Sequence, residues 1–249
     1  MKQEKSLKIA IIGIDGSGKS SCLEGVLREL SKRKVAGIGD DVLVSEKGVL
    51  SRPKIGYLQI KSFLGKRVKT IRNRTFYKLA KFSELISRVK IHDAIETKYK
   101  PEIILIDGSP LINALGWGSF YHPDFYSEDQ GETIMKYMMG EKIPPSRKVF
   151  YLKHIPEIFL VNKLGIKFQK PDVVFFLKVS PALAVKRIQM RGDERQIHEK
   201  IDFLEGLQKA YELVCNIISK TTRVYTINTD NKNPTEVISI IITEINENN

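Results

Sequence analysis

The chain has 249 residues, 42% of them hydrophobic, and its formal net charge is +12. This length can supply one sizeable core, so we expect a single domain over residues 1–249. The apolar run at residues 9–12 is too short for a signal peptide, and no stretch approaches the ~20 apolar residues that cross a bilayer, which predicts a soluble, cytoplasmic protein. Cys22 and Cys215 lack the paired spacing of a metal site or disulfide framework, which predicts buried thiols.

The first predicted elements are a strand, a glycine-rich loop and a helix. Residues 7–12 form an almost continuous apolar run that ends at Gly13, as is typical of a central parallel strand covered on both faces. After Ser20, apolar residues recur at helical spacing with charged residues between them. These apolar residues are Leu23, Val26, Leu27 and Leu30.

The next predicted elements are two strands separated by a helix. Residues 42–45 predict a short second strand. The apolar spacing from about residue 76 to residue 99 predicts a helix, which Pro101 ends. Residues 103–106 then form an apolar run followed by Asp107, which predicts a strand with a carboxylate at its C-terminal end.

The remainder of the chain begins with a segment of unclear pattern. Residues 111–170 predict a helical, aromatic insertion or cap, because a structureless loop of that length would be unusual. A buried strand is predicted at residues 173–179, and Ser180 and Pro181 are typical of a helix start. A helix, a strand and a helix are then predicted at residues 201–218, 224–227 and 235–245. Strands alternating with helices predict a parallel sheet with right-handed crossovers.

The strongest functional motif lies at residues 13–20, which match the phosphate-loop pattern G-x-x-x-x-G-K-[ST] at every position. The spacing lets amides of about residues 16–20 face phosphate oxygens at the helix N-terminus. Lys19 is expected to reach the β and γ phosphates, and the Ser20 hydroxyl to bind Mg²⁺. The residues predicted to bind the triphosphate are Gly13, Asp15, Gly16, Ser17, Gly18, Lys19, Ser20 and Ser21.

Asp107 is the expected carboxylate facing this loop, where it would help to organise the metal ion. The alternative is that Asp107 and Gly108 only turn the chain. A GTPase would need an Asn-Lys-x-Asp motif, whereas the stretch that begins with Asn162 and Lys163 has Gly165 in the aspartate position. A GTPase switch is therefore not expected.

Three arginines lie on or just after the helix that begins at Ser180, namely Arg187, Arg191 and Arg195. Phosphoryl transfer spreads negative charge over the equatorial oxygens, so guanidinium groups on a mobile segment can contribute much of the catalysis. A basic pair at this helical spacing is also common on a solvated helix face.

Residues 13–20 and 171–211 resemble the thymidylate kinase family of nucleoside monophosphate kinases. The likeness rests on the P-loop aspartate and on Pro171-Asp172-Val173, Ser180-Pro181, Ala184, Arg187, Arg191-Gly192, Phe203-Leu204 and Ala210-Tyr211. This resemblance implies an α/β P-loop NTPase fold, a three-layer sandwich with a five-stranded parallel sheet of order 2-3-1-4-5 flanked by helices. The helical, aromatic insertion would be additional.

The resemblance also implies Mg·ATP as the donor, a lid at about residues 192–199, and a homodimer. In that family, the P-loop acid at the position of Asp15 contacts the acceptor sugar, and members without an arginine beside it carry the catalytic arginines in the lid. This chain has no such P-loop arginine. We therefore expect at least two of Arg187, Arg191 and Arg195 to act in catalysis, and Asn228 to lie in the adenine-contacting loop.

The acceptor-side motifs depart from the family pattern. Gly108 replaces the phosphate-contacting arginine of the family's Asp-Arg pair, and the family's Arg-Glu-Pro-Gly-type loop is not recognisable at residues 45–48. Arg88 is only an approximate counterpart of the arginine expected on the helix before the third strand. This asymmetry implies the same reaction on a different or differently held acceptor.

The leading hypothesis is transfer of the ATP γ-phosphoryl group to a nucleoside monophosphate, with dTMP as the first candidate. Asp15 or Asp107 would orient the acceptor, and its phosphate would meet Arg88 or another basic residue of segment 61–90. The alternative within enzymes is a kinase that acts on a hydroxyl of a nucleoside or of another metabolite. It would need a carboxylate base, for which Asp15, Asp107 or Glu46 is available.

Residues 61–82 contain eight lysines or arginines and no acidic residue, interleaved with Phe63, Phe76 and Tyr77. Such a segment suits an anionic substrate, a nucleic acid or an anionic membrane face, and it is equally typical of the solvated surface of a basic protein. The alternative to an enzyme is therefore a nucleotide-dependent module that binds nucleic acid or membrane.

Overall fold

The computed structural model describes residues 5–59, 74–123, 128–141, 164–190 and 200–247. The chain divides into two compact units. The first consists of Met1–Pro53, Lys100–Ser109 and Pro171–Asn249, and the second of Lys54–Tyr99 and Pro110–Lys170. That the whole chain acts as one domain stays a prediction.

The first unit contains a seven-stranded sheet of order β4-β3-β2-β5-β1-β6-β7. Its strands are β1 (Leu7–Ile12), β2 (Val35–Ile38), β3 (Val42–Glu46), β4 (Val49–Ser51), β5 (Ile103–Asp107), β6 (Val173–Lys178) and β7 (Arg223–Asn228). Strands β2, β5, β1, β6 and β7 are parallel, which confirms the predicted order 2-3-1-4-5. The predicted number of five was too low, because β3 and β4 extend the sheet as antiparallel strands.

The second parallel strand is Val35–Ile38. The strand predicted at residues 42–45 is present as part of β3, but its predicted place as the second strand of the chain was wrong. Those later residues belong to β3, which runs antiparallel to β2. The sequence Val-Ala-Gly-Ile is a weak strand signal because it is short and contains glycine. Gly37 lies close to α1, since a Cβ atom there would meet Leu27 Cδ2 at 2.8 Å. Packing of α1 on the sheet therefore favours a small residue at this position, and that residue weakens the strand signal in the sequence.

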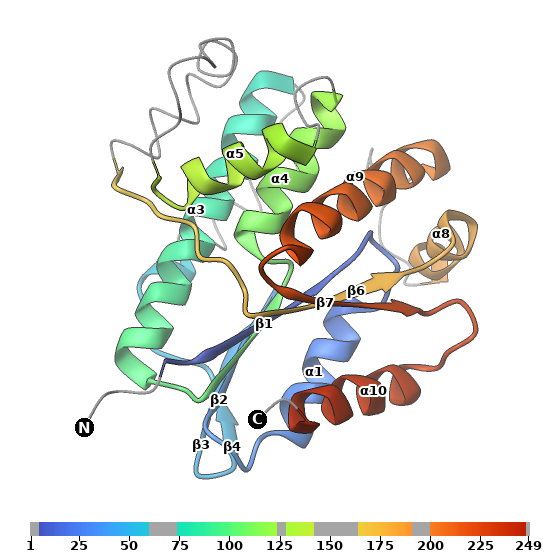
Figure 1. Cartoon of the computed structure of the whole chain (residues 1–249). Coiled ribbons are helices and arrows are strands. Elements are labelled where there is room, and N and C mark those ends of the chain that lie inside the picture. Colours follow the sequence, from blue (N-terminus) through green and yellow to red (C-terminus); the bar gives the residue numbers. More distant parts are fainter. Residues whose placement is uncertain (1–4, 60–73, 124–127, 142–163, 191–199, 248–249) are drawn as a thin grey trace. The chain divides into compact units, whose positions relative to one another are not determined.

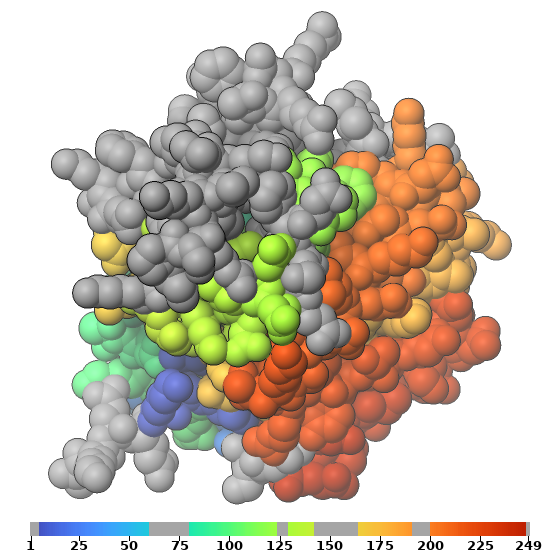
Figure 2. All heavy atoms as spheres, turned by 45° about the horizontal axis from the view of Figure 1, so that its top comes forward, coloured from blue at the N-terminus to red at the C-terminus, as the bar shows by residue number. Residues whose placement is uncertain are grey.

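The helices of the first unit are α1 (Lys19–Glu29), α8 (Pro181–Met190), α9 (Ile201–Ser219) and α10 (Pro234–Glu247). Helices α1 and α10 cover one face of the sheet, and α9 lies on the other, as Figure 1 shows. Ile9 and Ile11 of β1 join the core with α1 and α10, while Ala10 and Ile12 are buried on the opposite side. Helix α9 is coloured orange in Figure 2, and its exposed residues include Asp202, Glu205 and Lys209.

The second unit contains α3 (Arg74–Tyr99), α4 (Pro110–Tyr121) and α5 (Glu128–Met138). Helix α4 packs against α3 and α5, so the insertion contains helices as predicted. On α4, the Trp117 ring contacts those of Phe120 and Tyr121, so the insertion is aromatic as well as helical. Among the described residues, no helix combines the length and apolar character that crossing a membrane requires.

Candidate active site

The P-loop connects β1 to α1 through three glycines that adopt positive φ angles. Gly13 has φ 152° and Gly16 has φ 81°, in the region that residues with a side chain rarely adopt. A Cβ atom on Gly13 would lie 2.5 Å from the Leu177 carbonyl oxygen, and one on Gly16 would lie 2.5 Å from that of Ala184. The glycines at these two positions therefore allow the loop to pack against β6 and α8.

The first turn of α1 is suited to an anion. Gly18 caps the helix without a side-chain hydrogen bond, and the turn contains no acidic residue. The first amides of a helix have no partner within it and carry the positive end of its dipole. A Cβ atom on Gly18 would meet nothing within 4 Å among the described residues. Open space thus lies next to donor groups, as phosphate binding requires.

Lys19 is held by the loop that it follows. Its Nζ atom donates a hydrogen bond of 2.9 Å to the Ile14 carbonyl oxygen and lies 3.6 Å from Asp15 Oδ1. The Lys19 side chain is 17% exposed and that of Asp15 is 42% exposed. The predicted phosphate-binding lysine and the predicted acceptor-binding acid are therefore neighbours.

Ser20 and Asp107 come together although 87 positions separate them in the chain. The Ser20 hydroxyl donates a hydrogen bond of 2.7 Å to Asp107 Oδ2. This contact arises because β5 pairs with β1, with Asp107 opposite Ile11 at the end that leads into the P-loop. A hydroxyl and a carboxylate are oxygen ligands of the kind that Mg²⁺ prefers, so the pair fits the predicted metal site.

The two other predicted P-loop serines differ in exposure. Ser17 is 2% exposed, and its amide donates to the Ile14 carbonyl oxygen at 3.2 Å, so this amide closes the turn of the loop. That this amide also faces a phosphate stays a prediction. Ser21 is exposed on the first turn of α1, where its amide can face an anion.

Arg187 is half-buried and donates hydrogen bonds to two other segments of the first unit. Its Nη1 atom donates to the Gly16 carbonyl oxygen at 3.4 Å and to Thr229 Oγ1 at 3.3 Å, and Nη2 donates to the Thr229 carbonyl oxygen at 2.7 Å. Arg191, Arg195 and the predicted lid at residues 192–199 lie outside the described residues. Their catalytic roles stay predictions.

Asn228 ends β7 at the same edge of the sheet as the P-loop. Its Oδ1 atom accepts a hydrogen bond of 2.9 Å from the Asp230 amide, so the side chain helps to shape the loop between β7 and α10. Asp230 Oδ1 in turn accepts from the Ser180 amide at 2.7 Å. The predicted contact of Asn228 with adenine stays a prediction.

Arg88 lies on α3 in the second unit. Its Nη2 atom donates to Glu84 Oε1 at 3.3 Å, and the two side chains are 16% and 10% exposed. The predicted contact with an acceptor phosphate stays a prediction. Most of the basic segment, residues 60–73, lies outside the described residues.

The sequence reasoning overlooked a pair of carboxylates after β2. Because β2 ends at Ile38, residues 39–41 follow it at the carboxyl edge of the parallel strands, and they read Gly-Asp-Asp. A Cβ atom on Gly39 would lie 3.5 Å from Asp107 Cβ, so this loop adjoins the predicted metal ligand. Asp41 pairs with Arg52 at 2.9 Å, and Asp40 is exposed.

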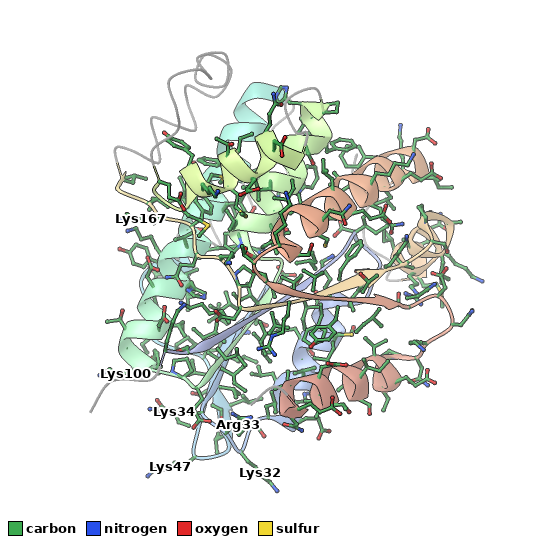
Figure 3. All side chains as sticks on the ribbon, viewed as in Figure 1. Lys32, Arg33, Lys34, Lys47, Lys100 and Lys167 are labelled. Carbon is green, nitrogen blue, oxygen red and sulfur yellow. The ribbon has the colours of Figure 1, made fainter. Side chains whose placement is uncertain are left out.

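Glu46 lies at the opposite edge of the sheet, so its interpretation as an available base was wrong. In the antiparallel pair, Val42 lies beside the end of β2, and the chain then runs back toward the start of β2. Figure 3 shows Lys47, the next residue, at that edge together with Lys32 and Lys34. The error followed from the misplaced second strand.

Cys22 and Cys215 are free and buried, as predicted. Burial raises the pKa of Cys22 from 9.0 to about 11, and the Asp107 carboxylate makes a smaller contribution in the same direction. The positive charge of Arg187 lowers this pKa and offsets part of the increase. Burial raises the pKa of Cys215 to about 12. Because the folded pKa of Cys22 is raised, its neutral thiol contributes stability fully below pH 9 and loses that contribution as the pH rises through about 11.

We expect the Cys22 thiol of a Cys215→Ala variant to react with iodoacetamide at a rate that still increases from pH 9 to pH 10. An ordinary thiol would approach its plateau there, because the thiolate is the nucleophile. Adding Asp107→Asn should accelerate the reaction at each pH, since removal of the nearby negative charge lowers the pKa of Cys22. Mass spectrometry gives the rates, and a plateau near pH 9 would contradict the raised pKa.

Comparisons with known proteins agree with this fold. A sequence model of the deoxynucleoside kinase family matches residues 148–248, which is less than half of the chain. A thymidylate kinase of Leptospira interrogans serogroup Icterohaemorrhagiae serovar copenhageni (strain Fiocruz L1-130) is 30% identical over 90 residues, covering 36% of this chain and 43% of that protein. A thymidylate kinase of Leptospira borgpetersenii serovar Hardjo-bovis (strain L550) is 22% identical over 240 residues, covering 96% and 92%.

Solved structures show the same fold. A deoxyadenosine kinase from M. mycoides, with the products dCMP and a flexible dCDP bound, aligns with TM-score 0.57 and 17% identity over 97% of this chain and all of that chain. The thymidylate kinase of Candida albicans aligns with TM-score 0.60 and 14% identity over 98% and 92%. The chain therefore has the fold of the P-loop nucleoside and nucleotide kinases. Its sequence is similar to those of the two Leptospira thymidylate kinases, in agreement with the resemblance seen in the sequence motifs.

Proposed function

We propose that the protein is an ATP-dependent phosphotransferase that transfers the γ-phosphoryl group to a nucleoside monophosphate, with dTMP as the first candidate acceptor. The observation that carries this proposal is the hydrogen bond of 2.7 Å between Ser20 and Asp107 at the end of a complete P-loop. A thymidylate kinase related over 96% of the chain supports the choice of acceptor.

The donor side of the proposed reaction uses residues of the first unit. Amides at the start of α1 would hold the phosphates, and Lys19 would exchange its contacts with Ile14 and Asp15 for phosphate oxygens. Ser20 and Asp107 would hold Mg²⁺, which when bound neutralises charge on the phosphates. The guanidinium groups of Arg191 and Arg195 would stabilise the negative charge of the transferring phosphoryl group.

On the acceptor side, a phosphate oxygen of the monophosphate forms a new bond to the γ-phosphorus of ATP. The bond from that phosphorus to the oxygen bridging to the β-phosphate breaks, which yields ADP and a nucleoside diphosphate. An acceptor phosphate is already largely ionised at neutral pH, so the site needs little general-base strength. Asp15 or Asp107 would orient the acceptor, and Arg88 would bind its phosphate.

A second candidate is transfer to a hydroxyl of a deoxynucleoside, and two observations favour it. Gly108 has φ 67°, so a turn that suits glycine stands where the related kinases carry a phosphate-contacting arginine. Asp40 also lies after β2 at the carboxyl edge of the sheet, where a carboxylate could accept the proton of an acceptor hydroxyl. The match to the deoxynucleoside kinase family supports the same acceptor class.

The test is Mg²⁺-dependent ADP formation by the purified chain with dTMP, the other monophosphates, and the corresponding nucleosides and sugars. We expect turnover with dTMP. The Asp40→Asn variant then separates the two acceptor classes. It should lower kcat on a hydroxyl acceptor by roughly 10²–10⁴-fold, because a general base is lost, and change kcat on a monophosphate little. Turnover confined to hydroxyl acceptors would overturn the leading proposal.

A role for segment 61–90 in binding nucleic acid or an anionic membrane, a homodimer and a cytoplasmic location stay predictions. If the chain were a nucleotide-dependent binding module, its ATP hydrolysis would require the polyanion and fall as salt increases. ADP formation with a small acceptor alone would favour the kinase.

A further inference from the structure

We propose that the edge of the sheet opposite the P-loop binds the phosphate backbone of duplex nucleic acid, without regard to base sequence. The surface consists of residues 31–34, 46–48 and 100–102, which we call the amino-edge patch because the parallel strands begin there. It is distinct from the P-loop and from the basic segment at residues 61–82. The proposal therefore does not depend on the proposed function.

The three segments of the patch meet because they flank neighbouring strands. The Glu102 amide donates to the Lys34 carbonyl oxygen at 2.7 Å, just before β5 and β2 begin to pair. Strand β3 runs antiparallel to β2, so the turn at residues 47–48 returns to this edge, where the Ser45 hydroxyl donates to the Ser31 carbonyl oxygen. Figure 3 shows the lysines of the patch at this edge, namely Lys32, Lys34, Lys47 and Lys100.

The patch contains five basic residues and two acidic ones, which gives it a net charge of +3. Arg33 is the basic residue with an acidic partner, since its Nε atom donates to Glu102 Oε2 at 3.4 Å. The four lysines are exposed, and none of them has an ion pair within the described part of the chain. Exposed charges of one sign on one edge create a local potential that attracts a polyanion.

Two of these lysines occupy backbone conformations that lysine does not favour. In the described part of the chain, the residues other than glycine with positive φ are Lys47, at 53°, and Lys100, at 47°. Lys47 begins the two-residue turn between β3 and β4, where asparagine or glycine is usual. Lys100 follows the last residue of α3, where glycine is usual. The positive charge is thus present where neutral residues would fit the backbone better, and such strain is typical of functional positions.

The composition of the patch favours a duplex over a single strand or a membrane. It has no aromatic residue on which an unpaired base could stack. Membrane-surface segments combine basic residues with Trp, Phe or Leu side chains. Of the exposed large apolar side chains among the described residues, only Val49 adjoins the patch in sequence. A lysine ammonium is a point charge, and phosphate contacts carry no direct sequence information.

The width of the patch matches several phosphates. The turn after β3, the start of β2 and the residues before β5 belong to three consecutive strands of the sheet. Neighbouring strands are ~4.8 Å apart, so the outer two segments are about 10 Å apart at the backbone. A DNA duplex carries one negative charge per ~1.7 Å of its axis, or roughly six over that width. Each of the four lysines can therefore meet a phosphate.

The experiment measures binding of a fluorescein-labelled DNA duplex of roughly 24 base pairs, and of the matching RNA duplex, by fluorescence anisotropy at about 50 to 200 mM salt. Each lost phosphate contact should reduce the slope of log affinity against log salt concentration by about 0.9 on DNA. Lys32→Gln/Lys34→Gln should therefore reduce it by about 1.8. The matched control, Lys186→Gln/Lys209→Gln, removes the same charge from exposed positions on α8 and α9 and should change the slope little.

Lys47→Asn/Lys100→Asn tests the other half of the patch and should also reduce the slope by about 1.8. Asparagine tolerates the left-handed conformation better than lysine, so the Tm of this variant should equal or exceed that of the wild type. Weaker binding by a protein of unchanged or higher Tm cannot come from misfolding. A lower Tm with an unchanged slope would overturn the proposal, because these lysines would then serve the fold.

Equal slope changes in the patch variants and the control would also overturn it, since overall charge would explain the binding. A wild type that binds neither duplex at about 50 mM salt would do the same, including one that binds phosphatidylglycerol vesicles instead. Competition between duplex and saturating Mg·ATP would place the duplex in the P-loop rather than on the patch. Both patch variants should form ADP at the wild-type rate, and a chain without kinase activity would contradict the proposed function alone.

Discussion

Replacing Lys19 with alanine should lower kcat by roughly 10²–10³-fold or more, because the variant loses the charged donor that stabilises the transferring phosphoryl group. The folded state should change little, since the Lys19 Nζ atom contacts only the Ile14 carbonyl oxygen and the partly exposed Asp15 among the described residues. Steady-state ADP formation with the best acceptor measures the effect, and thermal unfolding verifies the fold.

The matched control for this variant is Lys32→Ala, which removes the same charge at the opposite edge of the sheet. Lys32 is exposed in the turn after α1, and Figure 3 shows it beside Arg33 and away from the P-loop. It should retain wild-type kcat. A loss of less than about tenfold in Lys19→Ala would mean that the P-loop lysine does not take part in the transfer step.

Replacing Gly16 with alanine should destabilise the protein and abolish tight ATP binding. The backbone at φ 81° is strained for any residue with a side chain, at about 1–2 kcal/mol. The new Cβ would lie 2.5 Å from the Ala184 carbonyl oxygen and 2.9 Å from its Cα, and such overpacking costs typically about 1–3 kcal/mol. We therefore expect Tm to fall by roughly 5–15 °C, as differential scanning calorimetry can measure.

Gly18→Ala separates the two causes of this destabilisation. Gly18 has φ 95°, so alanine there meets similar backbone strain, but its Cβ would contact nothing within 4 Å among the described residues. Tm should therefore fall less in Gly18→Ala than in Gly16→Ala. Equal falls would show that contact with α8 adds nothing at Gly16, and that backbone strain alone determines the cost.

Most of the parallel sheet could be predicted from the sequence because its central strands are buried on both faces. Such strands are continuous apolar runs in the sequence. The runs at β1, β5 and β6 can each be recognised from their own residues alone. The second strand was missed for a tertiary reason, since Gly37 makes room for Leu27 of α1. Residues 42–45, which belong to β3, then stood as the second strand in the prediction.

The misplaced strand altered the predicted acceptor site as well. With β2 assigned to residues 42–45, Glu46 was expected at the edge that carries the P-loop, and Asp40 was not considered. The parallel pairing of β2 with β5 places Ile38 opposite Ile106, so the Gly-Asp-Asp loop follows next to Asp107. Strand direction, which no local pattern encodes here, decides which carboxylates can meet an acceptor.

The sequence by itself determined the P-loop, because its glycines, Lys19 and Ser20 lie within eight consecutive residues. Their spacing along the chain is enough to identify a phosphate-binding loop. It also indicated that Asp107 ends a buried strand. Only the tertiary structure decided that Asp107 bonds to Ser20, that Asp40 follows β2, and that Arg187 joins Gly16 to Thr229. The physical reason is that these contacts depend on strand register and helix packing between segments far apart in the chain, which local periodicity does not specify.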